Sequence, residues 1–236
     1  MRRRFFVDRF EQDRAAMTGD AAHHLGRVLR AEPGQLFELS DGKTAFLGRI
    51  ELVQKDRIDF ALIEPIASRE PALEATLLLS IVKFDSFEWA LEKATELGVR
   101  MIVPLAAARS EKALLQAAEK RAERWKKILL EAAQQSRRVS IPELKPMEKP
   151  TTAFGAGEGC KVILSERTEA QALKLVLAGL EASKAALAIG PEGGWTDEEF
   201  AAAGAAGFKQ ASLGSLILRT ETAVVTALAN LNYALG

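Results

Sequence analysis

The chain has 236 residues, of which 48% are hydrophobic and 27% charged, a composition typical of a soluble globular protein with one or two domains. Its 32 basic and 32 acidic side chains cancel, which excludes a protein whose whole surface attracts nucleic acid, so any site for a polyanion must be local. A single cysteine excludes an internal disulfide and a cysteine-rich zinc site, and no apolar run approaches the ~20 residues that span a bilayer. We therefore expect a cytoplasmic protein.

The first part of the chain has the alternating pattern that is typical of strands with one buried face. The alternation occurs in three segments: QLFELS (35–40), TAFLGRIELV (44–53) and RIDFALIEPI (57–66). Asp41-Gly42 between the first two predicts a tight hairpin turn, because both residue types tolerate positive φ angles. Before these strands, HHLGRVLR (23–30) has helical spacing, with Leu25, Val28 and Leu29 on one face. We expect residues 1–70 to form a small β-barrel or sheet.

From residue 74 onward, continuous apolar runs replace the alternation, and helical patterns separate them. The runs are TLLLSIV (76–82), MIVPL (101–105), KVIL (161–164), AALAIG (185–190) and ASLGSLIL (211–218). Because runs without alternation suit strands that are buried on both faces, residues 74–236 predict an α/β domain with a mainly parallel sheet. In the helix after the first run, Asp85 and Glu88 have the spacing of a capping box, and Phe84 can pack on Trp89.

The stretch 110–137 predicts a long helix, because Trp125, Ile128, Leu129 and Ala132 recur at helical spacing. Residues 109–138 contain nine basic and four acidic side chains, a local net charge of +5. Charge alone is equally consistent with a solvated helix face and with a surface that binds a polyanion. The proline- and glycine-rich segment 142–160 is expected to be a loop or an extended connection.

A glycine-containing loop, IGPEGG (189–194), follows one predicted strand. It precedes a helix that Thr196 and Glu199 are expected to begin as a capping box, with Trp195 able to pack on Phe200. The G-x-x-G-G spacing matches neither the dinucleotide fingerprint nor the phosphate loop of ATPases. The glycines therefore either shape a turn only or also let a ligand approach the backbone.

A second loop, LGSLILRTE (213–221), has the same construction. Thr220 is expected to cap the last helix, and Glu221 to complement the positive end of its dipole. ILSER (163–167) is a third junction between strand and loop. Because ligands of open α/β sheets collect at the carboxyl ends of the strands, these loops form the candidate ligand site. The adjacent His23 and His24 have no spacing that supports a metal, and no catalytic triad emerges.

Five blocks of the sequence, in this order, resemble the RsmE family of ribosomal RNA small-subunit methyltransferases, which methylate N3 of a uridine. The blocks are HHLGRVLR (23–30), EKATELGV (92–99), EAAQQSRRVSIPEL (131–144), IGPEGGWTDEE (189–199) and LGSLILRTETA (213–223). The resemblance implies a PUA-like RNA-binding β-barrel at residues 1–70 and a SPOUT methyltransferase domain with a deep trefoil knot at residues 74–236. It also implies a homodimer that uses S-adenosylmethionine to methylate 16S ribosomal RNA. The assembled small subunit is the expected substrate, and bare ribosomal RNA is the alternative that the sequence leaves open.

The resemblance further implies which residues bind the cofactor. They are Leu164, Ser165, Glu166, Ile189, Gly190, Pro191, Glu192, Gly194, Leu213, Gly214, Ile217, Leu218 and Thr220. Their composition suits that role, because glycines let backbone groups approach a ligand and Leu213, Ile217 and Leu218 can form an apolar wall. Leu216 departs from the family pattern, which has a basic residue at this position.

Methylation of N3 requires this nitrogen to lose its proton, and the resulting negative charge spreads onto the neighbouring carbonyl oxygens. Arg219 and Arg138 are the candidates for stabilising that charge, because a guanidinium donates to planar oxygens in a fork. Glu221 is the candidate base, and its role at the helix dipole is equally plausible.

Contacts with the RNA backbone are expected from arginines in both predicted domains. These are Arg2, Arg3, Arg4, Arg27 and Arg30 in the barrel, and Arg109, Arg137 and Arg138 in the second domain. Two other functions stay open. One is a related SPOUT enzyme that methylates a ribose 2′-oxygen, against which the barrel and the GPEGGWTDEE block argue. The other is a non-catalytic RNA-binding assembly factor, which Leu216 favours.

Overall fold

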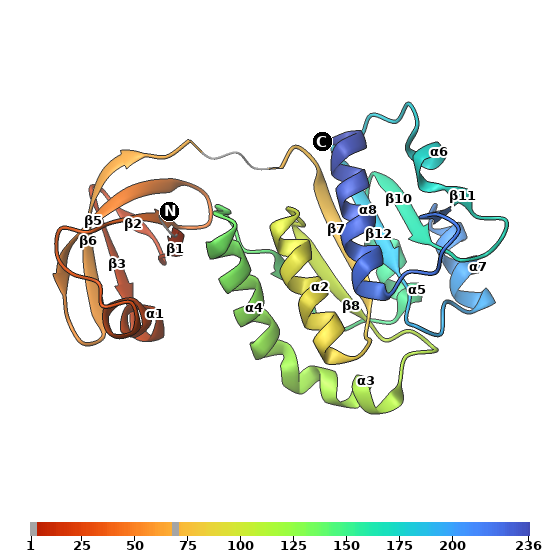
Figure 1. Cartoon of the computed structure of the whole chain (residues 1–236), viewed down its shortest axis with the longest axis horizontal. Coiled ribbons are helices and arrows are strands. Elements are labelled where there is room, and N and C mark those ends of the chain that lie inside the picture. Colours follow the sequence, from red (N-terminus) through yellow and green to blue (C-terminus); the bar gives the residue numbers. More distant parts are fainter. Residues whose placement is uncertain (1–3, 68–70) are drawn as a thin grey trace. The chain divides into compact units, whose positions relative to one another are not determined.

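The computed structural model describes residues 4–67 and 71–236, and the chain divides into two compact units (Figure 1). Unit 1 consists of Met1–Glu70 together with Ala133–Ile141, and unit 2 of Pro71–Ala132 together with Pro142–Gly236. The short segment 133–141 therefore belongs with the N-terminal unit, although it lies far along the chain. Within the described residues, no helix has the length and apolarity needed to cross a membrane.

Unit 1 is built around one curled, six-stranded sheet. Its strands, in the order β1-β4-β5-β6-β3-β2, are β1 (Arg4–Phe6), β4 (Leu36–Ser40), β5 (Ala45–Val53), β6 (Arg57–Pro65), β3 (Arg14–Thr18) and β2 (Phe10–Glu11). All neighbouring strands are antiparallel except β1 and β4, which are parallel. The inward side chains, among them Leu39, Ile50 and Phe60, form one buried cluster. The alternating pattern of the sequence thus predicted β4, β5 and β6 correctly, whereas it did not predict β1, β2 and β3.

The turn between β4 and β5 lies at Asp41-Gly42, as predicted. Gly42 has a φ of 86°, and one Asp41 carboxylate oxygen accepts hydrogen bonds from the amides of Lys43 (2.9 Å) and Thr44 (2.8 Å). The carboxylate thus satisfies donors that the tight turn leaves outside the ladder.

The helical segment of unit 1 differs from the prediction. It consists of α1 (Gly19–His23) followed by a π-helical turn (His24–Val28). Leu25 is buried, whereas Val28 and Leu29 are exposed, so the expected shared face does not form. The reason is the wider turn: the amide of Leu29 donates to the carbonyl of His24, five residues back, and this shifts the positions that face the core.

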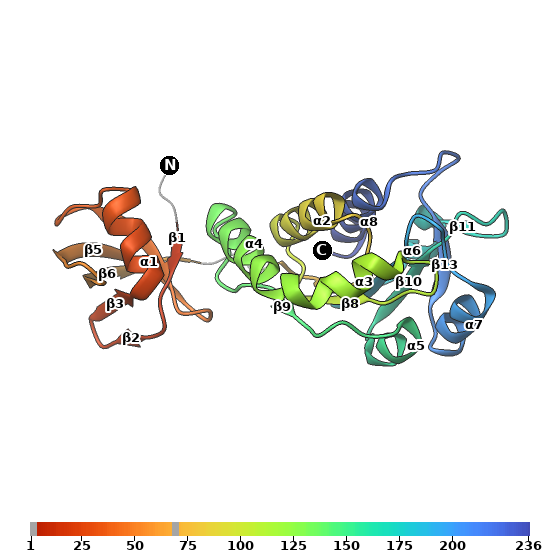
Figure 2. The same ribbon diagram turned by 90° about the horizontal axis from the view of Figure 1, so that it is seen from below.

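Unit 2 contains a seven-stranded sheet in which every described strand pair is parallel (Figure 2). In sheet order its strands are β11 (Gln171–Ala172), β13 (Lys209–Ser212), β10 (Cys160–Leu164), β12 (Lys184–Ile189), β7 (Glu74–Ser80), β8 (Met101–Leu105) and β9 (Glu143–Leu144). The last predicted strand is shorter than expected, because β13 ends at Ser212 and residues 213–219 form a loop.

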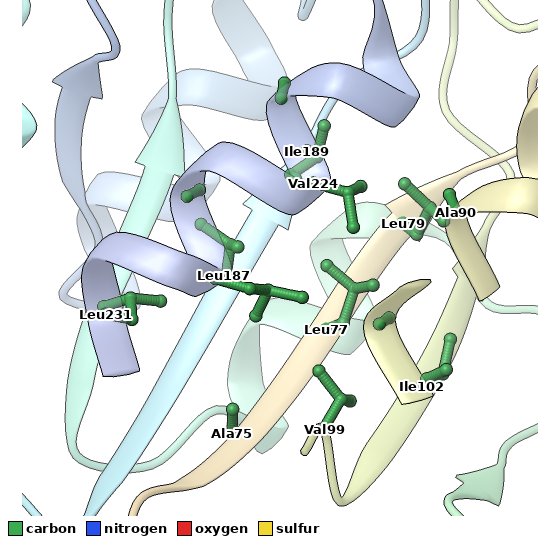
Figure 3. Close-up of a cluster of buried hydrophobic side chains, with 14 of the residues drawn as sticks. Ala75, Leu77, Leu79, Ala90, Val99, Ile102, Leu187, Ile189, Val224 and Leu231 are labelled. Atoms are coloured by element: carbon green, nitrogen blue, oxygen red, sulfur yellow. The ribbon is translucent and has the colours of Figure 1, made fainter. Parts of the chain in front are cut away.

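Helices cover both faces of this sheet. On one face lie α2 (Phe84–Glu96), α4 (Ala122–Gln135), α6 (Leu173–Leu177) and α8 (Thr220–Leu235), and on the other lie α5 (Pro150–Ala153) and α7 (Asp197–Ala205). Leu77 and Leu79 of β7 join the first cluster, which Figure 3 shows, and Leu78 joins the second. Burial on both faces explains why the strands of unit 2 are continuous apolar runs.

The start of α2 corrects the predicted capping box. The helix begins at Phe84 after Lys83, and no side chain caps it. Glu88 is buried and pairs instead with Arg121 and Arg124, because two guanidinium groups bind a carboxylate more strongly than the backbone amides do. Trp89 is exposed, which does not fit the expected packing of its side chain on Phe84.

The remaining segments follow the predictions in part. The basic stretch is helical but broken into α3 (Lys112–Ala118), a 3-10 turn (Glu119–Arg121) and α4. The expected loop 142–160 holds β9, α5 and a further 3-10 turn (Phe154–Ala156). The capping box of Thr196 and Glu199 is present at α7. At α8 the prediction was wrong: Thr220 is the first helical residue, Arg219 is the N-cap, and neither caps the helix with its side chain.

Candidate active site

A cavity of about 1000 Å³ lies in unit 2 at the carboxyl ends of β10, β12 and β13. Its walls are the three loops 164–168, 189–195 and 211–220, together with Lys83, Ser86 and Arg109. All of the residues that the resemblance assigns to the cofactor line this one cavity. Segments that lie up to 56 positions apart in the chain, from Leu164 to Thr220, thus converge because parallel strands end at the same edge of a sheet.

Two glycines of the loop after β12 disfavour a side chain, one by a close contact and one by its positive φ angle. A Cβ atom on Gly190 would lie 3.0 Å from the indole of Trp195, and Gly194 has a φ of 70°. The amide of Gly194 donates to the carbonyl of Pro191 at 2.8 Å, which closes the turn. The backbone of this loop therefore faces the cavity without covering side chains at its glycines.

Trp195 ties this loop to the loop after β10. Its indole is buried, and Nε1 donates to the carbonyl of Leu164 at 3.1 Å. Ser165 is also buried, and its amide donates to the carbonyl of Ala211 at 2.9 Å, which connects the loop after β10 to β13. Hydrogen bonds within the protein thus hold the three loops together.

Basic side chains predominate around the cavity. Lys83, Arg109, Arg167 and Arg219 line it, against the carboxylates of Glu166 and Glu192. Arg167 is partly neutralised, because it pairs with Asp197 while stacking on the ring of Phe200. The cavity suits a ligand or substrate that carries negative charge.

The loop 213–219 brings exposed apolar side chains to the same cavity. Leu216 is 79% exposed and Ile217 is 78% exposed, although both line the cavity. Leu216 therefore leaves an apolar side chain where the resemblance implies a basic one, and Arg219 is the basic group of this loop.

Of the two candidate catalytic residues in unit 2, one lines the cavity. Arg219 is exposed and lines the cavity. Glu221 is half-buried in the first turn of α8 and is not among the lining residues. Arg138 is buried in segment 133–141, which belongs to unit 1.

The candidate RNA contacts in unit 1 fall into two groups, and Arg2 and Arg3 lie outside the described residues. Arg4 is buried: its Nε donates to Glu38 at 3.2 Å, and its Nη1 donates to the carbonyl of Arg137 at 2.6 Å. The guanidinium of Arg137 also lies 3.6 Å from Glu38. Arg4 therefore holds segment 133–141 on the sheet, and its burial in this ion pair does not fit the expected contact with a phosphate.

Arg27 and Arg30 have the exposure that a phosphate contact needs. They flank Val28 and Leu29, which are also exposed, so the π-helical turn presents two basic and two apolar side chains together. In unit 2, Arg109 is exposed at the cavity, where Nη1 donates to the carbonyl of Gly193 at 3.0 Å. Within residues 4–67 and 71–236, no group of three or more His, Cys, Asp or Glu side chains could hold a metal ion.

Sequence reasoning missed several residues of the cavity. Lys83 and Ser86 come from the start of α2, whose position beside the other loops follows only from the strand order. Arg167 lies in ILSER shortly after a strand end, and this position was the available signal. The hydrogen bond of Trp195 to Leu164 had no signal in the sequence, since it joins residues 31 positions apart.

Family models match both parts of the chain. One, described as an RNA methyltransferase domain, matches residues 69–232, and the other, described as an RNA methyltransferase PUA domain, matches residues 17–63. Among curated relatives, the ribosomal RNA small subunit methyltransferase E of Synechocystis sp. is 36% identical over 229 residues, 93% of this chain and 73% of that protein. The protein of the same name from Bacillus subtilis is 31% identical over 92% of this chain and 89% of its own length.

Solved structures give the same result. A ribosomal RNA small subunit methyltransferase E from Neisseria gonorrhoeae, bound to S-adenosyl methionine, is 30% identical with a TM-score of 0.89, over 100% of this chain and 98% of that one. A putative methyltransferase from Legionella pneumophila, in complex with the same cofactor, is 31% identical with a TM-score of 0.89, over 99% of this chain and 98% of that one.

Proposed function

Because the chain belongs to the ribosomal RNA small subunit methyltransferase E family, we propose that it transfers a methyl group from S-adenosylmethionine to N3 of a specific uridine in 16S ribosomal RNA. The observation that carries the proposal is the convergence of the three family loops on one cavity of about 1000 Å³. The solved relative from Neisseria gonorrhoeae, which binds this cofactor, supports it. Since the proposed substrate is ribosomal RNA, we place the reaction in the cytoplasm.

The residues of the cavity fit the cofactor. The bare backbone at Gly190 offers its polar groups to a ligand, and Ile189, Leu213 and Leu218 offer apolar surface to a ring. When bound, the cofactor supplies an electrophilic methyl group on a sulfonium. The cavity volume lies at the upper end of the ~300–1000 Å³ that small-molecule sites occupy. A cavity of this size has space for a uracil ring beside the cofactor.

Arg219 is the residue that we assign to the developing charge on the uracil ring. Its guanidinium is exposed in the loop that lines the cavity, and it can donate to a planar carbonyl oxygen as N3 loses its proton. Glu221 follows two residues later and remains our candidate for accepting that proton, directly or through one water, because such contacts tighten when substrate binds. Arg138 is buried in segment 133–141 and remains a candidate for the same role as Arg219.

Residues 1–70 are proposed to form the RNA-binding domain, and residues 74–236 the methyltransferase domain with its deep trefoil knot. The match of the PUA model to residues 17–63 supports the first assignment. The exposed pair Arg27 and Arg30, beside the apolar Val28 and Leu29, is the candidate contact surface. Such arginines position the RNA backbone without reading its sequence. The knot is supported by family membership.

A homodimer is supported by the outer face of α8. Glu221 is the one charged side chain among the 16 residues of this helix. Its exposed positions include Thr222, Ala229 and Tyr233, and Tyr233 is 92% exposed. A helix face without charge in a protein with 27% charged residues is typical of a surface that a partner covers, and we propose a second copy of the chain as that partner.

The test is transfer of labelled methyl groups. Purified enzyme is incubated with methyl-labelled S-adenosylmethionine and either small ribosomal subunits or bare 16S RNA, both prepared from cells that lack the enzyme. We expect label in the RNA of the assembled subunits and far less in bare RNA. Absence of label from both substrates would refute the function, and label in bare RNA alone would refute the assembled subunit as substrate.

A further inference from the structure

The loop after β8, residues 106–110, is fixed tightly beside the cavity. Three hydrogen bonds hold it: Ala106 N to Glu148 O (2.8 Å), Ser110 Oγ to Ile81 O (2.8 Å) and Ala108 N to Glu199 Oε1 (2.8 Å). Between the last two anchors lies Arg109, whose side chain is exposed and lines the cavity. The backbone that carries Arg109 is thus held while its guanidinium stays accessible.

Glu199 does more than cap its helix. Its carboxylate is buried, with 5% of the residue exposed, and one oxygen accepts the amide of Thr196 at 2.9 Å as part of the capping box. The other oxygen is not needed by the helix and accepts the amide of Ala108, 91 positions away in the chain. Hydrogen bonds to a buried carboxylate are strong. One side chain therefore joins the first turn of α7 to the loop that carries Arg109.

Arg109 in turn packs on the glycine loop. Its Nη1 donates to the carbonyl of Gly193 at 3.0 Å, and a Cβ atom on Gly193 would lie 3.1 Å from the Cβ of Arg109. A guanidinium has five N–H donors, and this is the one hydrogen bond that Arg109 makes among the described residues. The other donors remain available at a cavity whose charged side chains are mainly basic.

We propose that Glu199 is a positioning residue for RNA binding: it holds the turn at Ala108 so that Arg109 meets a phosphate of the RNA at the mouth of the cavity. The fork of the guanidinium matches phosphate oxygens. Glu199 does not line the cavity, so it acts through Arg109 and contacts neither RNA nor cofactor. The proposal rests on the proposed function, because it assigns an RNA phosphate to the site of the proposed reaction.

Two variants weaken the link from opposite sides. Glu199→Gln leaves one oxygen acceptor for the amides of Thr196 and Ala108, which the carboxylate accepts with one oxygen each. Ala108→Pro removes the donated N–H without touching α7, and proline fits there, because the amide of Ser110 donates to Ala107 (3.1 Å) and makes Ala108 the second residue of a turn. Ala108 is exposed, so the ring has space. Thr196→Ala is the matched control, since it removes the other half of the capping box and leaves the bond to Ala108.

The measurements are KM for small ribosomal subunits, kcat, and the Kd of S-adenosylmethionine. We expect Arg109→Ala, Glu199→Gln and Ala108→Pro each to raise KM about tenfold, the effect of losing a hydrogen bond to a charged group. The Kd of the cofactor and the KM of Thr196→Ala should stay within about twofold of wild type. Glu199→Gln should cause no further rise in KM when Arg109→Ala is already present. The KM of each of the three variants should depend less on salt concentration than that of the wild type.

Several results would overturn the positioning role. They are an unchanged KM in Glu199→Gln and Ala108→Pro, an equal rise in Thr196→Ala, or effects of Glu199→Gln and Arg109→Ala that multiply. If the wild type transfers no methyl group, the proposed function fails by itself. The affinity of the same variants for small subunits, measured by filter binding, then decides the positioning role with the same expected pattern.

Discussion

Gly190 shows how one residue shapes the cavity. A Cβ atom there would lie 3.0 Å from the Trp195 indole, which is buried and holds the carbonyl of Leu164. Gly190→Ala must therefore displace the indole and disturb two cofactor loops together. We expect the Kd of S-adenosylmethionine, measured by calorimetry, to rise about tenfold, the cost of forcing a methyl group into a packed site.

The matched control for Gly190 is Gly204 within α7, where a Cβ atom would meet nothing within 4 Å. Gly204→Ala should leave the Kd unchanged and stabilise the protein by about 0.5–1 kcal/mol, because alanine favours the helix. An equal loss of cofactor affinity in both variants would show that the contact at Gly190 is not the cause.

The two candidate groups for N3 chemistry can be separated by substitution. Arg219→Lys and Glu221→Gln should each lower kcat by at least about a hundredfold, the usual contribution of such groups, while the Kd of the cofactor stays unchanged. Single-turnover methylation and calorimetry measure the two quantities. An unchanged kcat in Glu221→Gln would show that Glu221 is not the base. Its remaining role would be to complement the dipole of α8.

Capping boxes illustrate what single residues in a sequence can predict. Thr196 and Glu199 form the expected box, whereas Asp85 and Glu88 have the same spacing and do not. The difference lies in Arg121 and Arg124, which reach Glu88 from another helix. Spacing within a helix predicts local hydrogen bonds, and it gives no information on partners that arrive from 33 or 36 positions away.

Among the helices, the ion pairs of Glu88 with Arg121 and Arg124 join α2 to α4 and to the 3-10 turn before it. Glu88 is 8% exposed and receives hydrogen bonds of 2.8–3.0 Å from both arginines. Glu88→Gln should lower the free energy of unfolding by about 1.5–3 kcal/mol, the value of hydrogen bonds to a charged group. The exposed Glu96 of the same helix, paired with Lys93, is the control, and Glu96→Gln should cost less than about 1 kcal/mol.

The contribution of Glu88 should also depend on pH. The hydrogen bonds from Arg124 lower the pKa of the Glu88 carboxyl below its usual value of 4.5. A lowered folded-state pKa means that the stabilisation is complete above pH 4.5 and is lost as the pH falls through the folded value. Chemical denaturation should therefore show a constant difference between wild type and Glu88→Gln at neutral pH and a shrinking one below pH 4.5. A difference that persists in acid would contradict this account.

Strands were the most predictable elements, because burial leaves a direct pattern: alternation in unit 1 and continuous apolar runs in unit 2. The predictions failed where hydrogen bonding departs from the regular period. The π-helical turn moved Val28 and Leu29 out of the core, and the apolar run 211–218 left the sheet at Ser212. Leu216 and Ile217 are apolar but exposed, and hydropathy alone does not distinguish such residues from those of a buried strand.

For the whole molecule, the outer face of α8 predicts a dimer. Tyr233→Glu or Ala229→Glu places a charge on the uncharged face and should convert the dimer to monomers, which sedimentation velocity measures. Ile63→Glu, at an exposed apolar position of β6, should leave the dimer intact. A wild type that sediments as a monomer would contradict this proposal.

The two-part organisation could be predicted from the change of pattern near residue 70, but the membership of 133–141 in unit 1 could not. That segment is held by Arg4, Glu38 and Ser40, whose partners lie about a hundred or more positions away along the chain. The meeting of the three loops at one edge of the sheet was predictable from the strand ends, whereas the cofactor followed only from the resemblance. The residues that the resemblance assigns to the cofactor all line the cavity at these strand ends.

Nucleoside analysis shows whether the enzyme methylates N3 of a uridine. Small subunits from cells that lack the enzyme are incubated with S-adenosylmethionine and either wild type or Arg219→Lys, and the RNA is digested and analysed by mass spectrometry. We predict 3-methyluridine with the wild type and a large loss with the variant. Methylation of a ribose 2′-oxygen, or the absence of methylated uridine with the wild type, would show that the enzyme does not methylate N3 of a uridine.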